Sequence, residues 1–325
     1  MGDDSVRPLD WRPMPSPTPP ATPAPSQFQG YVAALTTVVV WAGFILISRL
    51  GGKTALTGWD IVALRLGTAA LFLLPFSIKL PPGTWRNPRL WTLAGLGGII
   101  FLIFIYAGFK LAPAAHGGIL LPGLQPFMVT ALAWVLLGSR PDRQRLWGLL
   151  PIALGVACVA IPQLTGSHGG PGTLAGDGLI LCASVTWAAY SVLVKKWAFD
   201  PWLLTRFVAI ASALVYLPVY WLWLPRHLDQ VPMSMLVLQG LYQGLGPTII
   251  AMVMFLRAVE ILGAERTGAL VALVPVLAGL GAVPLLDEPL TVWLVAGLAL
   301  VSLGAFLCAR PPRSLPPPVP QRRDA

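Results

Sequence analysis

Charged residues are scarce in this chain of 325 residues, in which Asp, Glu, Lys and Arg together account for 11% of positions. Soluble domains carry about 25% charged residues, so this composition excludes an ordinary water-soluble fold. Instead, 56% of the residues are hydrophobic and the mean hydropathy is +0.73. Apolar runs long enough to cross lipid recur along the chain, and they indicate an integral membrane protein.

Residues that bind metals or form disulfides are also few. Cys158, Cys182 and Cys308 all lie inside apolar runs without metal-ligand spacing, so we expect them to be small packing residues. The three histidines form no HxxxH pattern and no cluster with cysteine, so we expect no metal and no cofactor. A lipid-modifying enzyme would need a nucleophile, a metal set or an acid–base pair clustered at membrane depth. The sequence shows no such cluster, so we expect a protein that is not an enzyme.

Positive charges are distributed unevenly around the apolar runs. The net charge is +9, a balance that nucleic-acid-binding proteins share. If the N-terminus is cytoplasmic, sixteen of the 22 lysines and arginines fall in cytoplasmic loops and tails, and four fall outside: Arg49, Lys53, Lys110 and Arg226. By the positive-inside rule, this bias predicts a multi-pass protein of the inner (cell) membrane with both termini cytoplasmic. It also explains the basic character without a nucleic-acid partner.

The apolar runs predict ten transmembrane helices between two tails. Residues 1–29 are polar and proline-rich, and we expect a disordered cytoplasmic tail rather than a signal peptide. Residues 310–325 form a basic cytoplasmic tail. Each run approaches the roughly 20 residues that a spanning helix needs, and none alternates as a strand would. The runs lie at about 30–47, 59–78, 90–111, 114–137, 146–162, 178–194, 202–224, 235–259, 267–286 and 290–307.

The second half of the chain repeats the first. Residues 255–309 align without a gap on residues 106–160, which pairs Pro126 with Pro275. The same alignment pairs Gly148 with Gly297 and Gly155 with Gly304, and similar matches pair Trp41 with Trp187 and Arg65 with Arg206. We therefore predict two five-helix halves, 30–162 and 178–309, joined by a linker at 163–177. Because five is odd, the second half must enter the membrane inverted. Inverted repeats with proline-broken helices are typical of secondary transporters, whose substrate site lies near the midplane.

These residues together resemble the drug/metabolite transporter superfamily, and in particular its EamA-type ten-helix permeases. The resemblance covers residues 30–309 and rests on Trp41, Trp187, the segment that Arg65 begins (RLGTAALFLLP), and the two proline-bearing segments AAHGGILLPGLQP and ERTGALVALVP. In that family a glutamate usually follows each of these two proline-bearing segments. Here Glu288 follows the second segment as expected, whereas Ser139 stands at the corresponding position after the first. The resemblance implies transport of small organic metabolites, often export of amino acids or drugs, by alternating access. A membrane receptor without transport is the alternative.

Aromatic and amide side chains are the first candidates for a substrate site. Trp41, Phe44, Tyr106, Trp187 and Tyr190 either line a cavity for flat solutes or act as anchors at the membrane interface. Gln125 and Gln243 are flanked by glycine and proline, and they either offer neutral hydrogen bonds to a substrate or pack against backbone.

Ionisable side chains inside a span are costly and often functional. Arg65 and Arg206 either bind a substrate carboxylate or hold helix-end carbonyls, or pair with Asp60 and Asp200. His116 is either a coupling proton site or a buried neutral histidine, since histidine titrates near roughly pH 6.5. Glu265 is either a proton or cation site at a cavity mouth or part of a solvated loop.

Four glycines recur seven residues apart, at 148 and 155 and again at 297 and 304. This spacing puts each pair on one helix face, where small residues let two helix backbones approach closely. The pattern predicts close packing of the fifth and tenth helices or a contact in a homodimer. The expected partners are thus a small-molecule substrate, the lipid bilayer and a second copy of the chain.

Overall fold

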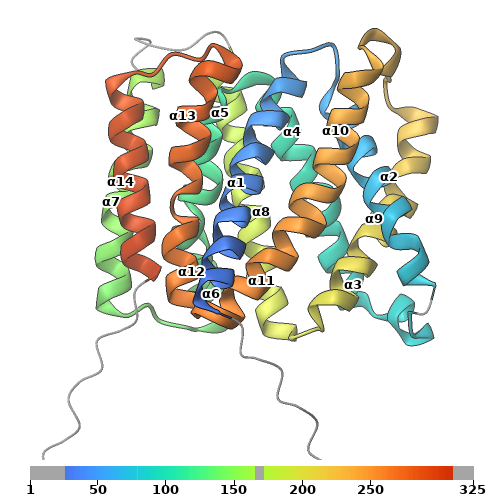
Figure 1. The fold of residues 1–325 in the computed structure, drawn as a ribbon, viewed down its shortest axis with the longest axis horizontal. Coiled ribbons are helices and arrows are strands. Elements are labelled where there is room, and N and C mark those ends of the chain that lie inside the picture. The colour runs from blue at the N-terminus through green and yellow to red at the C-terminus, as the bar shows by residue number, and fades with distance from the viewer. Residues whose placement is uncertain (1–25, 79, 165–171, 310–325) are drawn as a thin grey trace, which may run out of the picture.

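The computed structural model describes residues 26–78, 80–164 and 172–309, and every regular element in these ranges is helical. The predicted tails lie almost wholly outside the described residues, as do residues 165–171 of the predicted linker. The longer helices run up and down through one bundle (Figure 1). They are α1 (Gln27–Gly52), α2 (Gly58–Ser77), α3 (Pro88–Leu93), α4 (Phe101–Leu111), α5 (Ala114–Gly118), α6 (Gln125–Leu137), α7 (Arg143–Leu164), α8 (Thr173–Trp197), α9 (Pro201–Trp223), α10 (Met233–Leu245), α11 (Ala251–Leu262), α12 (Ala264–Val271), α13 (Val274–Leu286) and α14 (Val292–Ala309).

Nine helical stretches within the described ranges are long and apolar enough to cross a membrane. Four of them combine two labelled helices each: α3 with α4, α5 with α6, α10 with α11, and α12 with α13. Large apolar side chains such as Trp147 and Trp223 are exposed on the outside of the bundle, as lipid-facing positions would be. The predicted all-helical membrane fold is therefore confirmed. Helix α7 has 22 residues but is not among these nine, so the count of ten spans stays a prediction.

The combined stretches are broken near their middle. Short π-helical turns interrupt three of them: η2 (Ala94–Ile100), η3 (Ile119–Gly123) and η5 (Gly246–Ile250). The fourth breaks at Ala272, between α12 and α13. Pro126 and Pro275, which match in the sequence repeat, each lie in the first turn of the helix after a break. Proline is tolerated there because the first turn of a helix leaves its N–H groups unpaired in any case.

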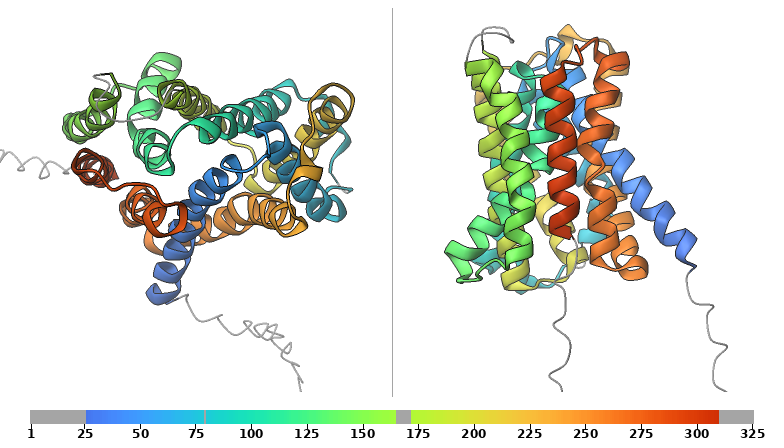
Figure 2. Two further views of the ribbon diagram at one scale, coloured as in Figure 1. Left: turned by 90° about the horizontal axis from the view of Figure 1, so that it is seen from above. Right: turned by 90° about the vertical axis from the view of Figure 1, so that its left-hand side faces the viewer.

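Helices from residues 26–164 pack against helices from residues 172–309 throughout the bundle. The most extensive of these contacts are α7 with α14, α1 with α11, α4 with α8, α2 with α9, and α2 with α10. If α8 is equivalent to α1 and α11 to α4, the pairs α1–α11 and α4–α8 are the same contact made twice. Helix α8 also begins at the end of the bundle where α1 ends (Figures 1 and 2). The division into two inverted halves stays a prediction, and this reciprocal packing supports it.

Glycines bring α7 and α14 into close contact. A Cβ atom added at Gly155 would lie 2.8 Å from the carbonyl oxygen of Gly297, and one at Gly304 would lie 2.6 Å from that of Gly148. A Cβ atom this close to a facing backbone would force the two helices apart, so glycine is needed at these positions. The four glycines that recur seven residues apart are thus used inside one chain, and a homodimer stays a prediction.

The bundle has two ends that matter for the site. We name the end where α1 begins and α14 ends the tail end, and the opposite end, where α1 ends and α8 begins, the far end (Figure 1). Both described ends of the chain thus lie on the same side of the bundle.

Candidate functional site

A cavity of about 420 Å³ extends from the middle of the bundle to its tail end. Its wall includes Arg145 near the start of α7 and Ala309 at the end of α14, both at the tail end. Its mid-bundle wall uses three of the helix breaks, through Leu121 and Pro122 in η3, Pro247 in η5, and Ala272. Most of the wall is apolar. Its remaining lining residues are Trp41, Phe44, Ile45, Arg65, Phe101, Gln125, Pro126, Val129, Trp187, Ser191, Met252, Phe255, Gly268, Val271, Val274, Ala305 and Cys308.

Six of the residues expected from the sequence line cavities in this region. Trp41, Phe44, Arg65, Gln125 and Trp187 lie in the wall of the large cavity. Tyr190 lines a smaller cavity of about 80 Å³, whose wall shares Arg65, Trp187, Pro247 and Met252 with the large one. Their role in binding stays a prediction.

Aromatic rings from both parts of the chain form pairs in these walls. Trp41 in α1 lies 5.5 Å from the ring of Phe255 in α11. Phe101 in α4 lies 4.9 Å from Trp187 in α8, and Trp187 lies 5.1 Å from Tyr190. Such ring pairs give the cavity flat apolar surfaces suited to flat or amphipathic solutes.

A chain of polar side chains holds Arg65. The Nη1 atom of Arg65 donates to the hydroxyl of Tyr106 at 3.2 Å, and that hydroxyl donates to Oε1 of Gln243 at 3.2 Å. The amide of Gln243 donates in turn to the hydroxyl of Ser48 at 3.1 Å. The guanidinium also lies 5.4 Å from the centre of the Phe44 ring. Tyr106 and Gln243 are fully buried behind the wall, so they orient Arg65 rather than line the cavity.

Two further polar groups of the wall are tied to neighbouring helices. The amide of Gln125 donates to both the carbonyl and the hydroxyl oxygen of Ser184, each at 3.1 Å. Arg145 Nε donates to the hydroxyl of Thr130 at 2.7 Å. These bonds link α6 to α8 and α7 to α6.

Of the other predicted residues, His116 and Arg206 lie away from the cavity wall. His116 lies against Asp177, with Nδ1 3.0 Å from Oδ1. Arg206 donates to the carbonyl of Phe76, near the end of α2, at 2.6 Å, which corresponds to the helix-end interpretation. Glu265 lies in α12, but its side chain is outside what the structure describes. The partners proposed for the two arginines are engaged elsewhere, since Asp60 bonds to Tyr220 and Asp200 caps α9.

An ion pair joins helices at the far end, beyond the cavity. Arg49 Nε at the end of α1 lies 2.9 Å from Oε1 of Glu288, and Oε2 of Glu288 accepts from the backbone N–H of Ala114 at 2.8 Å. Arg49 also donates to the carbonyl of Phe109, and Lys53 to that of Leu286. The ends of α1, α4 and α13 and the start of α5 are thereby joined.

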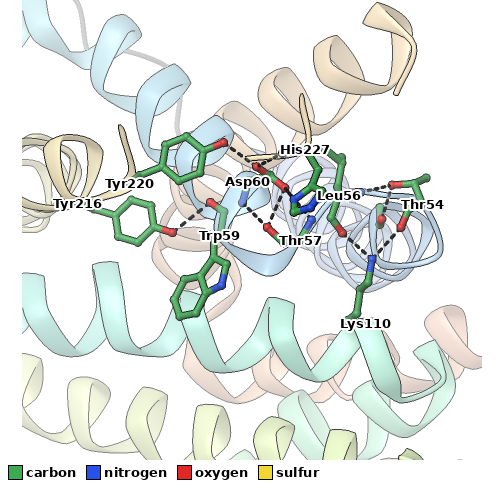
Figure 3. A network of polar contacts seen from close by, with 10 residues as sticks. Thr54, Leu56, Thr57, Trp59, Asp60, Lys110, Tyr216, Tyr220 and His227 are labelled. Atoms are coloured by element: carbon green, nitrogen blue, oxygen red, sulfur yellow. Dashed lines mark hydrogen bonds and ion pairs between the residues drawn. The ribbon is translucent and has the colours of Figure 1, made fainter. Parts of the chain in front are cut away.

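A second polar network lies at the far end around Asp60 (Figure 3). The Asp60 carboxylate is fully buried and accepts from the backbone N–H and hydroxyl of Thr57, each at 2.7 Å, and from the hydroxyl of Tyr220 at 2.6 Å. Thr57 and Asp60 form a capping box that starts α2. Lys110 donates to the carbonyls of Thr54 and Leu56. This network ties α9 and α4 to the turn before α2.

Sequence reasoning missed three groups that matter for this arrangement. Arg49 and Arg145 entered the sequence analysis only as loop charges, although Arg49 joins helices at the far end and Arg145 lines the cavity. Asp60 was considered only as a partner for arginine. The spacing of Thr57 and Asp60 is that of a capping box, and this pattern could have predicted Asp60 at the start of α2. Among the described residues, no group of three or more His, Cys, Asp or Glu side chains could hold a metal ion.

Comparison with known proteins identifies the family. The family model described as "EamA-like transporter family" matches residues 28–161 and again residues 174–310. The chain belongs to the EamA-like transporter family. Its relatives include the uncharacterized transporter YyaM of Bacillus subtilis, 24% identical over 75% of this chain and 82% of the relative. Another is an uncharacterized transporter of Archaeoglobus fulgidus, 22% identical over 86% of this chain and 98% of the relative.

Structural comparison agrees with this fold. One solved crystal structure is 22% identical, covers 87% of this chain and 96% of its own, and superposes with a TM-score of 0.57. At this identity the match supports the fold alone. This EamA-like protein is therefore a multi-pass membrane transporter with a small-molecule substrate, and the names of its family and relatives indicate a transporter rather than an enzyme.

Proposed function

We propose that this EamA-like transporter is a secondary carrier that exports small organic solutes by alternating access, with the cavity of about 420 Å³ as its substrate site. The observation that carries the proposal is this cavity, which reaches the tail end of the bundle while polar networks close the far end. Its volume falls in the range of about 300–1,000 Å³ that is typical of small-molecule sites.

The closed end and the open end suggest the direction of access. At the tail end the cavity wall contains Arg145, Cys308 and Ala309. At the far end Arg49 and Glu288 join helices from both parts of the chain. The distribution of lysine and arginine predicts that the tail end is cytoplasmic. A solute would then enter from the cytoplasm and leave after the far-end contacts separate.

The broken helices supply the moving parts that such a cycle needs. In secondary transporters, discontinuous helices form the substrate site near the midplane, and one part of the bundle rocks against the other. Here η3, η5 and the break at Ala272 all contribute lining residues. Amino acids and drugs both belong to the size class that this cavity admits.

Flux through purified full-length protein tests the proposal. Proteoliposomes loaded with a mixed pool of small metabolites should exchange at least one of them faster than protein-free liposomes, with and without a pH gradient. A solute that binds the protein and shows no flux would contradict transport and favour a receptor. Hydrolysis or modification of lipid without flux would favour the enzyme alternative.

A further inference from the structure

Among the residues that the structure describes, the charged groups in the wall of the large cavity are all positive. Arg65 and Arg145 line it, and none of its described lining residues is Asp or Glu. The remaining polar side chains of this wall, Gln125 and Ser191, are neutral. A solute in this cavity therefore meets two guanidinium groups and no carboxylate among the described residues.

Arg65 carries a charge that its protein neighbours do not balance. Among the described residues it forms no ion pair, and its partners are the hydroxyl of Tyr106 and the ring of Phe44. A guanidinium has five N–H donors, and the one hydrogen bond described for it uses one of them. An arginine in a membrane span is costly to insert and normally has a partner or water. A bound anion would supply that partner.

The two arginines stand at the two ends of the cavity. Arg65 lies seven residues into α2, about two turns from the far end. Arg145 is the third residue of α7 and lies at the tail end, with Asp142 accepting from its backbone N–H at 2.7 Å. An anion entering from the tail end thus passes Arg145 before it reaches Arg65.

The space between the arginines is bounded by flat rings. Trp41 with Phe255 and Phe101 with Trp187 form the aromatic pairs described above. A guanidinium matches a carboxylate with two parallel hydrogen bonds, and the rings match a flat apolar body. An ammonium group would lose its water shell here without gaining a carboxylate from any described lining residue, which is unfavourable.

We propose, building on the proposed transport function, that the substrate is an amphipathic organic monoanion whose carboxylate binds Arg65 and whose flat apolar body lies between these rings. The site selects for such anions and against amines. Arg145 attracts the anion at the tail end, while Tyr106 and Gln243 are positioning residues that hold Arg65.

Three probes of one shape test this selection. We would measure binding of 2-naphthylacetate, the neutral 2-naphthylacetamide and the cationic 2-(2-naphthyl)ethylamine to the purified full-length protein by equilibrium dialysis. The anion is expected to bind at least tenfold more tightly than the amide or the amine. Equal binding of the amide or the amine, or no binding of any probe, would overturn the proposal.

Substitutions test whether the preference for the anion over the amide depends on Arg65. Arg65→Gln should reduce the affinity for the anion at least tenfold, to that for the amide, and Arg65→Lys should keep part of the preference. Arg206→Gln is the matched control, because Arg206 is its counterpart in the repeat and does not line the cavity. Both affinities are measured on the same preparation of each variant, so their ratio does not depend on the fraction of the protein that is folded. An unchanged ratio in Arg65→Gln would refute the role of Arg65.

Transport of the same probe separates this inference from the proposed function. An anion that binds with an Arg65-dependent preference and also exchanges across proteoliposomes supports both. Arg65-dependent binding without exchange supports the anion site and contradicts transport.

Discussion

At the scale of single residues, two arginines that match in the sequence repeat have different surroundings. Arg65 lines both cavities, whereas Arg206 bonds to the carbonyl of Phe76. The same residue type thus faces a cavity in one case and holds a helix end in the other. Matching positions in a repeat therefore need not share a role, because each residue takes the partners that its own surroundings provide.

Glu288 is the residue whose loss should open the far end. Replacing it with glutamine removes the charge that Arg49 and the N–H of Ala114 share. Hydrogen bonds to charged groups contribute about 1.5–3 kcal/mol each. Their weakening should raise the equilibrium constant for opening of the far end by roughly tenfold or more. We expect Glu288→Gln to raise, by at least that factor, the rate at which an impermeant maleimide reaches a cavity cysteine from the far side.

The cysteine for this measurement is Leu121→Cys, in a protein whose three native cysteines are replaced. Leu121 is buried and lines the cavity, while Leu124 is equally buried and does not, so Leu124→Cys reports labelling unrelated to the cavity. Asp287→Asn is the matched control for charge, because Asp287 is the exposed neighbour of Glu288. If Glu288→Gln and Asp287→Asn are labelled at the same rate, the ion pair does not close the far end.

At the scale of helices, α7 and α14 form a fixed pair at one side of the bundle. Their backbones approach through glycines on both helices, and the cavity wall includes residues near the tail end of each, Arg145 and Cys308. The pair therefore supports part of the cavity wall near the tail end.

A single methyl group should disrupt this pair. In Gly155→Ala the new Cβ would lie 2.8 Å from the Gly297 carbonyl and 3.0 Å from the Val301 nitrogen, and backbone atoms cannot move aside. Overpacking of this kind costs about 1–3 kcal/mol, so we expect a lower thermal midpoint in detergent. Gly67→Ala is the control, because its Cβ would meet no described atom within 4 Å and alanine favours a helix. Equal midpoints for the two variants would show that the contact is not tight.

At the scale of the whole molecule, the large cavity reaches the tail end of the bundle. The described chain begins and ends at this same end (Figure 1). Polar networks around Glu288 and Asp60 join the helices at the opposite end. In an alternating-access cycle, the cavity would next open to the far end while the helices join at the tail end.

Labelling from the two sides of the membrane tests this arrangement. Lys196→Cys lies at the tail end and Asp229→Cys in the loop at the far end, and both native residues are exposed. In right-side-out vesicles an impermeant maleimide should label Asp229→Cys directly and Lys196→Cys only after permeabilisation. Labelling of both before permeabilisation, or of Lys196→Cys alone, would contradict the predicted orientation and with it the export direction.

The sequence by itself determined the membrane class and the helical fold, and it predicts the two repeats. This was possible because the length of an apolar run and the spacing of its residues are local properties of the chain. A segment in lipid must pair its own backbone groups, so a long apolar run forms a helix. It also named Trp41, Phe44, Arg65, Gln125 and Trp187, all of which the fold brings to one cavity.

Only the tertiary structure decided which polar residues face that cavity and which close the far end. Arg145 lines the wall, His116 lies against Asp177, and Arg49 pairs with Glu288 across 239 positions of sequence. These contacts join helices that are distant in the chain. Their partners follow from how the two parts of the bundle pack together, and no local pattern of residues specifies that.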